Sequence, residues 1–276
     1  MVLKTYRSVF RDAYTHIRRE GPRDTLKAAL RQANISYEGY YYFANYRYKR
    51  LQRHCVSESE LFRTLWIDPA SIIYLPTRRF DKWLNMGEIR DGNWDQPDGL
   101  FDDRPLIQTL QARFEDGISW DELRYVQQAL KTVRNGGSTW NGCRSLEDVR
   151  RRCKQLDGLY ETIHDQGFKS QAELHGTNNK SILLSGTFDR SKTDIVLHIG
   201  RNGELLFVDG NHRLAIAKIL DIDSVPVRIC VRHEEWQQIR EQVANADVEE
   251  KLPESVKRHR SHPDLRNIYP SETNKN

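Results

Sequence analysis

The sequence predicts a mixed α/β domain of the α+β class, and two patterns in it predict this class. Apolar residues in the spacing of strands occur at 65–75 and again between 193 and 232. Between 105 and 167 the apolar residues instead recur every three or four positions, as in amphipathic helices. With 276 residues the chain is long enough to enclose a sizeable core around these elements.

Composition divides the chain into three parts. Residues 1–60 are predicted to form a basic, tyrosine-rich helical extension, since residues 1–56 hold 12 Lys and Arg against four Asp and Glu, and eight of the 12 tyrosines. Residues 61–246 form the predicted core domain. Residues 247–276 are polar and punctuated by proline, so we expect a tail that is poorly ordered or docked at the periphery, anchored by Leu252, Leu265 and Ile268.

Three interpretations of the basic extension stay open. One face of its helices could pack on the core while the basic face is merely solvated. The basic face could lie on an anionic membrane surface. Its basic and aromatic side chains could also bind nucleic acid, with cations on phosphates and tyrosines stacked on bases. Both polyanionic partners attract the same residues, so composition does not separate them.

The sequence argues against several classes of protein. It has no apolar run of about 18 residues, so we expect no membrane-spanning helix. The first residues lack the apolar stretch of a secretory signal. The four cysteines form no Cys-x-x-Cys pair and are too few for a disulfide framework, so we expect reduced thiols and a cytoplasmic protein, with peripheral membrane contact through residues 1–56 as an open alternative.

The core begins with a predicted strand and an acidic segment. Residues 65–75 favour a strand with a turn at 68–69. The segment that follows is rich in acidic residues and glycine, which is typical of a solvated loop. Alternatively, Glu88, Asp91 or Asp95 from this loop could act as a general base or bind Mg²⁺ beside an active site.

Three helices are predicted next. The first begins at Pro105, a residue favoured in the first helical turn. The second begins after Ser119, which stands three residues before Glu122 in the spacing of a capping box, and it ends before the glycines at 136–137. The third helix spans about 146–167.

Residues 193–233 predict a hairpin, a helix and a returning strand. Apolar residues alternate from 195 to 199, Asn202-Gly203 favours a tight turn, and 205–208 predicts a buried strand. The helix that follows is apolar on most sides, so we expect it to be enclosed. In the last strand, proline at 226 is expected at the start of the strand or at a sheet edge.

The turn between the hairpin and that helix has the composition of a phosphate site. The first N–H groups of a helix, here those of 211–213, lack partners within the helix and lie at the positive end of its dipole. Gly210 would let a ligand approach closely, Arg213 offers a two-pronged donor and His212 a switchable one. Asp209 could accept a proton or orient a metal-bound water. Alternatively, Asp209 only caps the helix, and His212 and Arg213 only stabilise the turn.

The segment FVDGNHRLAIAKILDIDSVPVRI resembles the ParB/sulfiredoxin-like superfamily, in which a strand, an Asp-Gly-His-His-Arg turn, an alanine-rich helix and a Val-Pro-Val strand follow one another. The resemblance covers about 190–232 and implies a small mixed sheet with packed helices, here enlarged by a helical insertion at about 80–155. It also implies that Gly210, Asn211, His212 and Arg213 hold the phosphates of ATP or CTP, with Mg²⁺ bound and Asp209 beside them.

The chain departs from the known members in ways that narrow the expected function. Asn211 stands where sulfiredoxin has its reactive cysteine, which excludes that repair chemistry. Too few residues follow 233 for the DNA-binding module of a partitioning protein. We therefore expect an ATP-dependent phosphotransferase acting on a small molecule. The alternatives are a non-enzymatic nucleotide switch or nucleic-acid-binding module, and a nuclease, which would need a cluster of metal-binding carboxylates.

Overall fold

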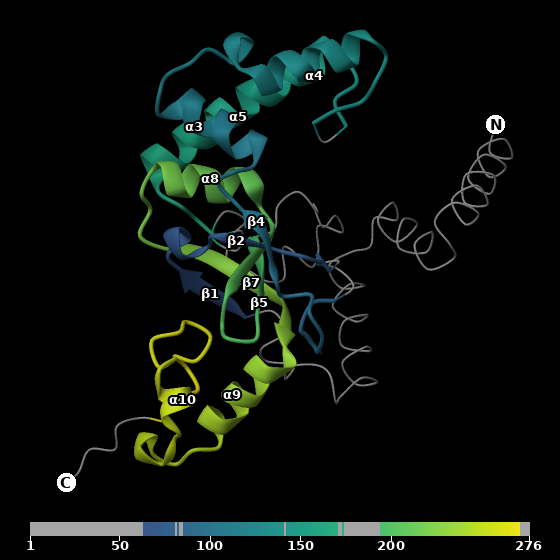
Figure 1. The fold of residues 1–276 in the computed structure, drawn as a ribbon. Coiled ribbons are helices and arrows are strands. Elements are labelled where there is room, and N and C mark those ends of the chain that lie inside the picture. The colour runs from purple at the N-terminus through teal and green to yellow at the C-terminus, as the bar shows by residue number, and fades with distance from the viewer. Residues whose placement is uncertain are drawn as a thin grey trace, which may run out of the picture. The chain divides into compact units, whose positions relative to one another are not determined.

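The computed structural model describes residues 63–80, 82, 85–140, 142–170, 173 and 194–270. Among them, seven strands form one mixed sheet (Figure 1). Six follow one another in the order β1-β7-β5-β6-β2-β4. The seventh, β3, pairs with the last residues of β7 (231–233), past the part of β7 that pairs with β1. The strands are β1 (Thr64–Ile67), β2 (Tyr74–Pro76), β3 (Glu88–Arg90), β4 (Pro97–Leu100), β5 (Ile195–Ile199), β6 (Leu205–Asp209) and β7 (Val225–His233). The α+β class is thus confirmed.

The centre of the sheet is buried on both faces. Strand β5 lies between β7, which is parallel to it, and β6, which is antiparallel. Along β6, Leu205 and Phe207 belong to one apolar cluster, whereas Leu206 and Val208 belong to a second one. Because side chains alternate between the faces of a strand, these two clusters lie on opposite faces. The predicted hairpin is confirmed, and Gly203 in its turn has a φ of +89°.

Four helices gather at one end of the sheet and two at the other (Figure 1). The first group contains α3 (Pro105–Phe114), α4 (Arg124–Arg134), α5 (Leu146–Gln166) and α8 (Asn211–Ile219), and the second contains α9 (Glu234–Ala244) and α10 (Glu254–Lys257). Helix α8 contacts α3, α5 and β5. Its Leu214, Ala215, Ile216 and Ala217 are buried, as expected of an enclosed helix.

Two local predictions differ from the structure. The predicted strand at 65–75 is two strands, β1 and β2, separated by a short 3-10 helix (Pro69–Ser71) in which the Asp68 carboxylate accepts from the Ala70 N–H at 2.7 Å. The prediction of a capping box at Ser119 is wrong. Ser119 precedes only a 3-10 turn (Trp120–Glu122), and α4 begins later because Leu123 is buried in an extended conformation. The capping box that forms is at Ser145 and Asp148, before α5.

The acidic segment after residue 80 is more than a solvated loop. It contributes the two short strands β3 and β4 to the sheet. Glu88 and Asp95 are buried in it, with 6% and 3% of their surface exposed. Trp94 and Phe80 pack edge to face at 5.4 Å between ring centres and cover part of the second apolar cluster. Apolar residues therefore fold this segment onto the sheet despite its charge.

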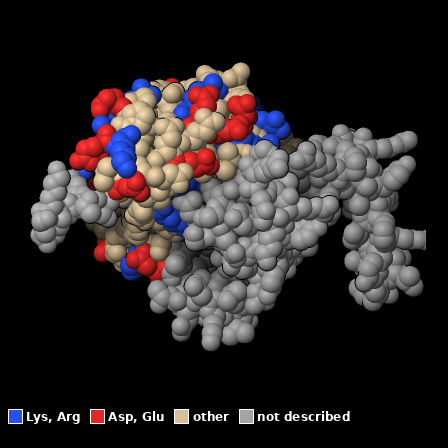
Figure 2. All heavy atoms as spheres, turned by 90° about the horizontal axis from the view of Figure 1, so that it is seen from below, with Lys and Arg blue, Asp and Glu red and all other residues tan. Residues whose placement is uncertain are grey.

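The C-terminal segment packs on the domain. The predicted anchors Leu252 and Leu265 are buried, while Ile268 packs partly buried against the same cluster. Asp264 is fully buried and was not predicted as an anchor. Its carboxylate accepts two hydrogen bonds from Arg232 on β7, at 2.7 and 2.9 Å, and one from the Trp236 indole at 3.0 Å. Acidic and basic side chains are interspersed over the described part of the surface viewed from below (Figure 2).

Residues 1–60, the predicted basic extension, lie outside the described part of the chain, which begins at residue 63. The helical, membrane-binding and nucleic-acid-binding interpretations of that segment therefore stay predictions. Among the described residues, no helix is long and apolar enough to span a bilayer.

Candidate anion-binding site at the start of α8

The turn from β6 into α8 is built around Gly210. This residue is the N-cap of α8 and has a φ of +103°, and no side chain caps the helix. The first hydrogen bond of the helix runs from the Leu214 N–H to the Gly210 carbonyl at 3.0 Å. Within the described residues, the N–H groups of Asn211 and His212 have no acceptor. These two N–H groups lie at the positive end of the helix, where they can bind an anion.

Glycine is required at this turn for two reasons. A φ of +103° is strained for any residue that carries a Cβ atom. In addition, a Cβ at Gly210 would lie 3.1 Å from the Cα and Cγ1 atoms of Ile195 on the neighbouring strand. The turn is therefore packed tightly against β5, and its backbone has little room to change shape.

The Asp209 side chain does not cap the helix. Its carboxylate instead forms an ion pair with the Lys82 ammonium group, which comes from the segment between β2 and β3. The Lys82 side chain is 16% exposed and that of Asp209 is 43% exposed, so solvent reaches the carboxylate. Asp209 therefore remains accessible to a ligand.

A second cation reaches the turn from another segment. The Arg104 guanidinium, directly before α3, donates to the side-chain oxygen of Asn211. The same guanidinium lies over the Phe207 ring, 5.8 Å from its centre. Arg104 thus connects the first turn of α8 to the start of α3.

His212 has a third cation as a neighbour. Burial, together with the nearby guanidinium of Arg152 on α5, lowers the pKa of His212 to about 4. The ring is therefore neutral at pH 7. Its Nε2 atom is buried and has no hydrogen-bond partner, and the same is true of Nε of Arg152.

Arg213 lies in a different position from the one predicted. Its guanidinium lies over the Phe168 ring at 4.4 Å and donates to the Lys169 carbonyl. It also pairs with the buried carboxylate of Asp194 at 3.6 Å. Arg213 therefore fastens the start of α8 to neighbouring segments.

The predicted acids Glu88, Asp91 and Asp95 are not brought to the turn. Asp209 is paired with Val196 near the beginning of β5, whereas Asp95 accepts from the backbone N–H of Arg201 after the end of that strand. At about 3.3 Å per residue, four to five residues separate them by roughly 15 Å. Glu88 is level with Val231 near the same far end, where it accepts from Asn85 at 2.8 Å.

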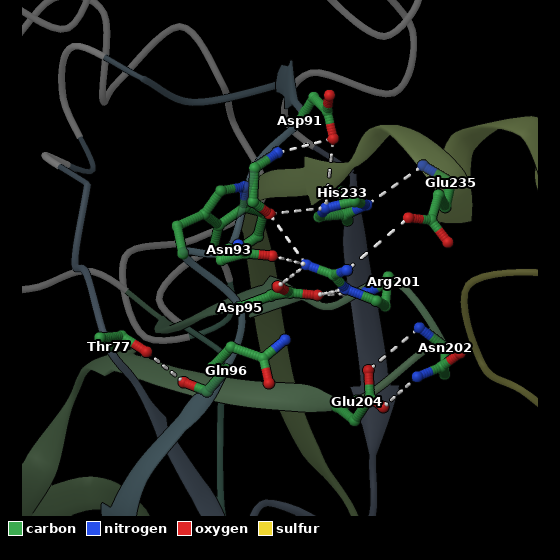
Figure 3. A network of polar contacts seen from close by, with 12 residues as sticks. Thr77, Asp91, Asn93, Asp95, Gln96, Arg201, Asn202, Glu204, His233 and Glu235 are labelled. Carbon is green, nitrogen blue, oxygen red and sulfur yellow. Dashed lines mark hydrogen bonds and ion pairs between the residues drawn. The ribbon is translucent and has the colours of Figure 1, made fainter.

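Asp95 belongs to a structural network at the far end of the hairpin (Figure 3). Arg201 donates to both of its carboxylate oxygens, at 2.8 and 2.9 Å. Burial raises the pKa of Asp95, but these hydrogen bonds outweigh it and lower the pKa below its ordinary value. Asp91 is exposed and lies 3.8 Å from His233 in this network. These acids hold the loop on the hairpin turn, away from Asp209.

Sequence reasoning did not find the three cations around the turn. Lys82 and Arg104 stand 127 and 107 positions from the residues they contact, so no local motif connects them. Arg152 lies in a basic helical stretch that is typical of an exposed face. The only sequence signal for all three is their charge, which many surface residues share.

Comparison of the chain with models of protein families, with curated proteins and with solved structures finds no match. Among the described residues, no group of three or more His, Cys, Asp or Glu side chains could together hold a metal ion. The functional argument therefore depends on the turn itself. It offers free backbone amides and nearby cations to an anion, and one accessible carboxylate next to them.

Proposed function

We propose that the protein binds a nucleoside triphosphate at the start of α8 and transfers its terminal phosphoryl group to a small molecule. One observation carries this proposal. Lys82 and Arg104, from two separate segments, contact side chains of a turn whose first amides are unpaired, and Arg152 is close enough to help lower the pKa of His212. Cations and backbone amides together are the groups that proteins use to bind phosphates. The resemblance of 207–229 to the ParB/sulfiredoxin-like superfamily supports the same ligand.

Two of the cations are positioned to exchange partners when a phosphate arrives. Lys82 and Arg104 now contact side-chain oxygens of Asp209 and Asn211, and the Asp209 carboxylate is partly solvated. The carboxylate of the Lys82 pair is partly solvated, and ion pairs open to solvent are worth only about 0–1 kcal/mol, so replacing the pair costs little. A phosphate oxygen between these side chains would accept from both cations and from the free amides of the turn.

Asp209 is the general base in this proposal. It would accept the proton of the acceptor hydroxyl while the hydroxyl oxygen forms a bond to the terminal phosphorus. The bond from that phosphorus to the bridging oxygen then breaks, and the nucleoside diphosphate leaves with the electron pair. Lys82 and Arg104 would neutralise the charge on the transferred group, which is the main requirement of this chemistry.

The residues at the turn fit Mg²⁺ in the manner usual for nucleotide sites. Mg²⁺ is commonly held by one or two carboxylates together with phosphate oxygens and water. Asp209 supplies one accessible carboxylate, so it would hold the ion only through the oxygen that does not accept the proton. When bound, the ion would add positive charge at the phosphates. The remaining contributions come from the protein's own side chains.

The ion pair between Lys82 and Asp209 also favours a second candidate, a nucleotide-dependent switch without turnover. A carboxylate that stays bound to Lys82 is a poor proton acceptor. In that case, nucleotide binding would rearrange Lys82 and the segment that carries it, and no phosphoryl group would be transferred.

The test measures binding and turnover separately on the full chain. ATP and CTP with Mg²⁺ are screened by thermal shift, and hydrolysis or transfer is followed with labelled nucleotide. For the phosphotransferase we expect Asp209→Asn to keep the thermal shift and to lose turnover by about 10²–10⁴-fold. A shift without turnover in the natural sequence favours the switch, and no shift with any nucleotide contradicts both candidates.

A further inference from the structure

Helix α4 presents a face without acidic residues to solvent. Its buried residues are Val126, Ala129 and Val133, which belong to the larger apolar cluster. Its exposed residues are all basic or carry a side-chain amide, and they are Arg124, Gln127, Gln128, Lys131 and Arg134. With 3.6 residues per turn, these five lie on the side of the helix opposite to the three buried residues. The helix itself contains no Asp or Glu.

Helix α4 is also the outermost helix of its group. It lies at the end of the group farthest from the sheet, and it contacts α3, α5 and the 3-10 turn Trp120–Glu122 (Figure 1). The Tyr125 ring meets the Trp140 ring edge to face, with 5.5 Å between the ring centres. The Gln127 side chain donates to the Asp121 carbonyl at 3.1 Å. The helix is therefore a fixed ridge whose polar side is open to a large partner.

The cations of this face have no counter-ion in the described part of the chain. Arg124, Lys131 and Arg134 form no ion pair there. Lys131 and Arg134 lie in the last turn, where cations stabilise a helix, so the helix dipole accounts for them. Arg124 is the first residue of α4, at the positive end, where a cation is unfavourable and an anion is favoured. An anion from outside would satisfy Arg124.

The beginning of α5 extends the positive charge. Arg144, just before α5, and Arg150 and Lys154 within it are exposed and, among the described residues, also lack an ion pair. Residues 124–156 hold eight Lys and Arg against two Asp and Glu, a net charge of +6, whereas the rest of the chain carries −2. On the side of α9 and α10, acidic and basic side chains are interspersed (Figure 2). Positive charge is therefore concentrated around α4 and the start of α5.

We propose that α4, with the start of α5 beside it, binds double-stranded DNA. Arg124, Lys131 and Arg134 extend over about 15 Å of the helix axis, at 1.5 Å per residue. The major groove of B-DNA is about 12 Å wide, which admits one α-helix and brings its cations to the phosphates that border the groove. The amides of Gln127 and Gln128 can bond phosphates or base edges. Neither this surface nor its test depends on nucleotide binding at the start of α8, because no residue of α4 belongs to that site.

Other polyanions fit this surface less well. A helix that lies on a membrane buries its apolar side in the bilayer, but the apolar side of α4 is already buried in the core. The large exposed apolar residues lie on or beside β1, β2 and β4, and they are Trp66, Ile73, Tyr74 and Leu100. Double-stranded RNA has a deep, narrow major groove that protein side chains do not read. B-form DNA is therefore the partner that the shape and charge of α4 favour.

The test measures how DNA binding by the full chain depends on salt. A short, labelled, mixed-sequence duplex is titrated at several salt concentrations and followed by fluorescence anisotropy. The variant carries Arg124→Gln, Lys131→Gln and Arg134→Gln. The matched control carries Lys251→Gln, Arg258→Gln and Arg266→Gln, which are exposed residues of the C-terminal segment. Each triple change removes three positive charges and leaves the basic residues 1–56 unaltered, so binding through that segment affects both proteins equally.

We expect the variant in α4 to bind the duplex at least about tenfold more weakly at low salt. Its plot of log K against log salt concentration should be shallower by about 2–3, since each phosphate contact contributes about 0.9 to the slope. The control should keep both the affinity and the slope of the natural sequence. Glutamine forms helices nearly as well as arginine and lysine, so the melting temperature of the variant should be unchanged.

Displacement of the labelled duplex identifies the partner. At equal total negative charge, unlabelled duplex DNA should displace it better than duplex RNA, poly-glutamate or vesicles that contain phosphatidylserine. The proposal is overturned if the natural sequence does not bind the duplex at low salt, or if the two triple variants weaken binding equally. It is also overturned if another polyanion displaces the duplex better than DNA does, or if the variant in α4 loses binding only together with a lowered melting temperature.

Discussion

Lys82 and Asp209 form an ion pair at the rim of the turn that begins α8, although 127 positions separate them in the sequence. The Asp209 side chain is 43% exposed, so water screens the attraction. By contrast, the ion pair between Arg232 and Asp264 is buried, with side-chain exposures of 2% and 0%. The two pairs therefore have different purposes. The buried pair holds the C-terminal segment, and the part-buried pair places a lysine beside an accessible carboxylate.

Replacing Lys82 should change stability very little. Lys82→Met removes a pair whose carboxylate is partly solvated, so we expect the free energy of unfolding to fall by about 1 kcal/mol or less. Urea denaturation of the variant and the natural sequence measures this difference. A loss of several kcal/mol would mean that Lys82 is a structural residue rather than part of a binding site.

Replacing Asp264 should be much more costly. Arg232 and Arg240 both face this carboxylate, and Asp264→Asn would leave the two buried cations without its charge. We expect the free energy of unfolding to fall by about 3–5 kcal/mol. The control is Asp247→Asn in the same segment, since its partner Lys251 is exposed and the change should be small. Equal effects of the two variants in urea denaturation would refute this assignment.

Gly210→Ala tests how tightly the turn packs. Alanine at a positive φ costs about 1–2 kcal/mol, and its Cβ would also lie 3.1 Å from the backbone of Ile195. Gly99→Ala is the control, because Gly99 has a φ of +92° but no atom within 4 Å of a Cβ. We expect Gly210→Ala to lose about 1–3 kcal/mol more than the control, as overpacking does. Comparable losses would show that the turn can relax.

The burial of His198 predicts that the stability of the fold depends on pH. It is fully buried between Phe80 and Trp94, and burial, with smaller effects of Arg79 and Arg90, lowers its pKa to about 3. Below about pH 6.5 the unfolded chain binds a proton that the folded chain does not. This histidine therefore lowers stability progressively as the pH falls from about 6.5 to 3, and it has no such effect above that range.

His198→Phe should remove this contribution. The difference in unfolding free energy between the variant and the natural sequence should shift in favour of the variant by up to about 1.4 kcal/mol for each pH unit below 6. Denaturation at pH 4.5, 5.5 and 7.5 measures it. A difference that stays constant over these three values would contradict a histidine that remains neutral in the folded state.

The elements closest to the turn could be predicted from sequence because their signals are local. The alternation in 195–199, the glycine at 203 and the apolar helix after Gly210 each depend on neighbouring residues, and the structure has all three. The predicted start of α4 after Ser119 is wrong, because burial of Leu123 overrides the preference of Ser119 for the start of a helix. Local preference is a weak signal wherever tertiary packing competes with it.

The cations of the site could not be predicted, because their positions depend on the tertiary fold. Arg213 has the right residue type at the right place in the motif, yet it contacts Asp194 and the Phe168 ring, which the motif does not predict. Lys82 and Arg104 take positions beside the turn because β2 and α3 pack next to β6 and α8. A motif identifies the backbone that binds an anion, whereas the surrounding charges follow from the fold.

The central claim is that the start of α8 binds nucleotide phosphates through Lys82 and Arg104. The direct measurement is calorimetric titration of ATP and CTP, with Mg²⁺, into the full chain and into a double variant with Lys82→Met and Arg104→Met. Arg150→Met serves as the charge control. We predict that one nucleotide binds the natural sequence and the control equally and binds the double variant at least about tenfold more weakly. No binding of either nucleotide, or equal binding by all three proteins, would contradict the claim.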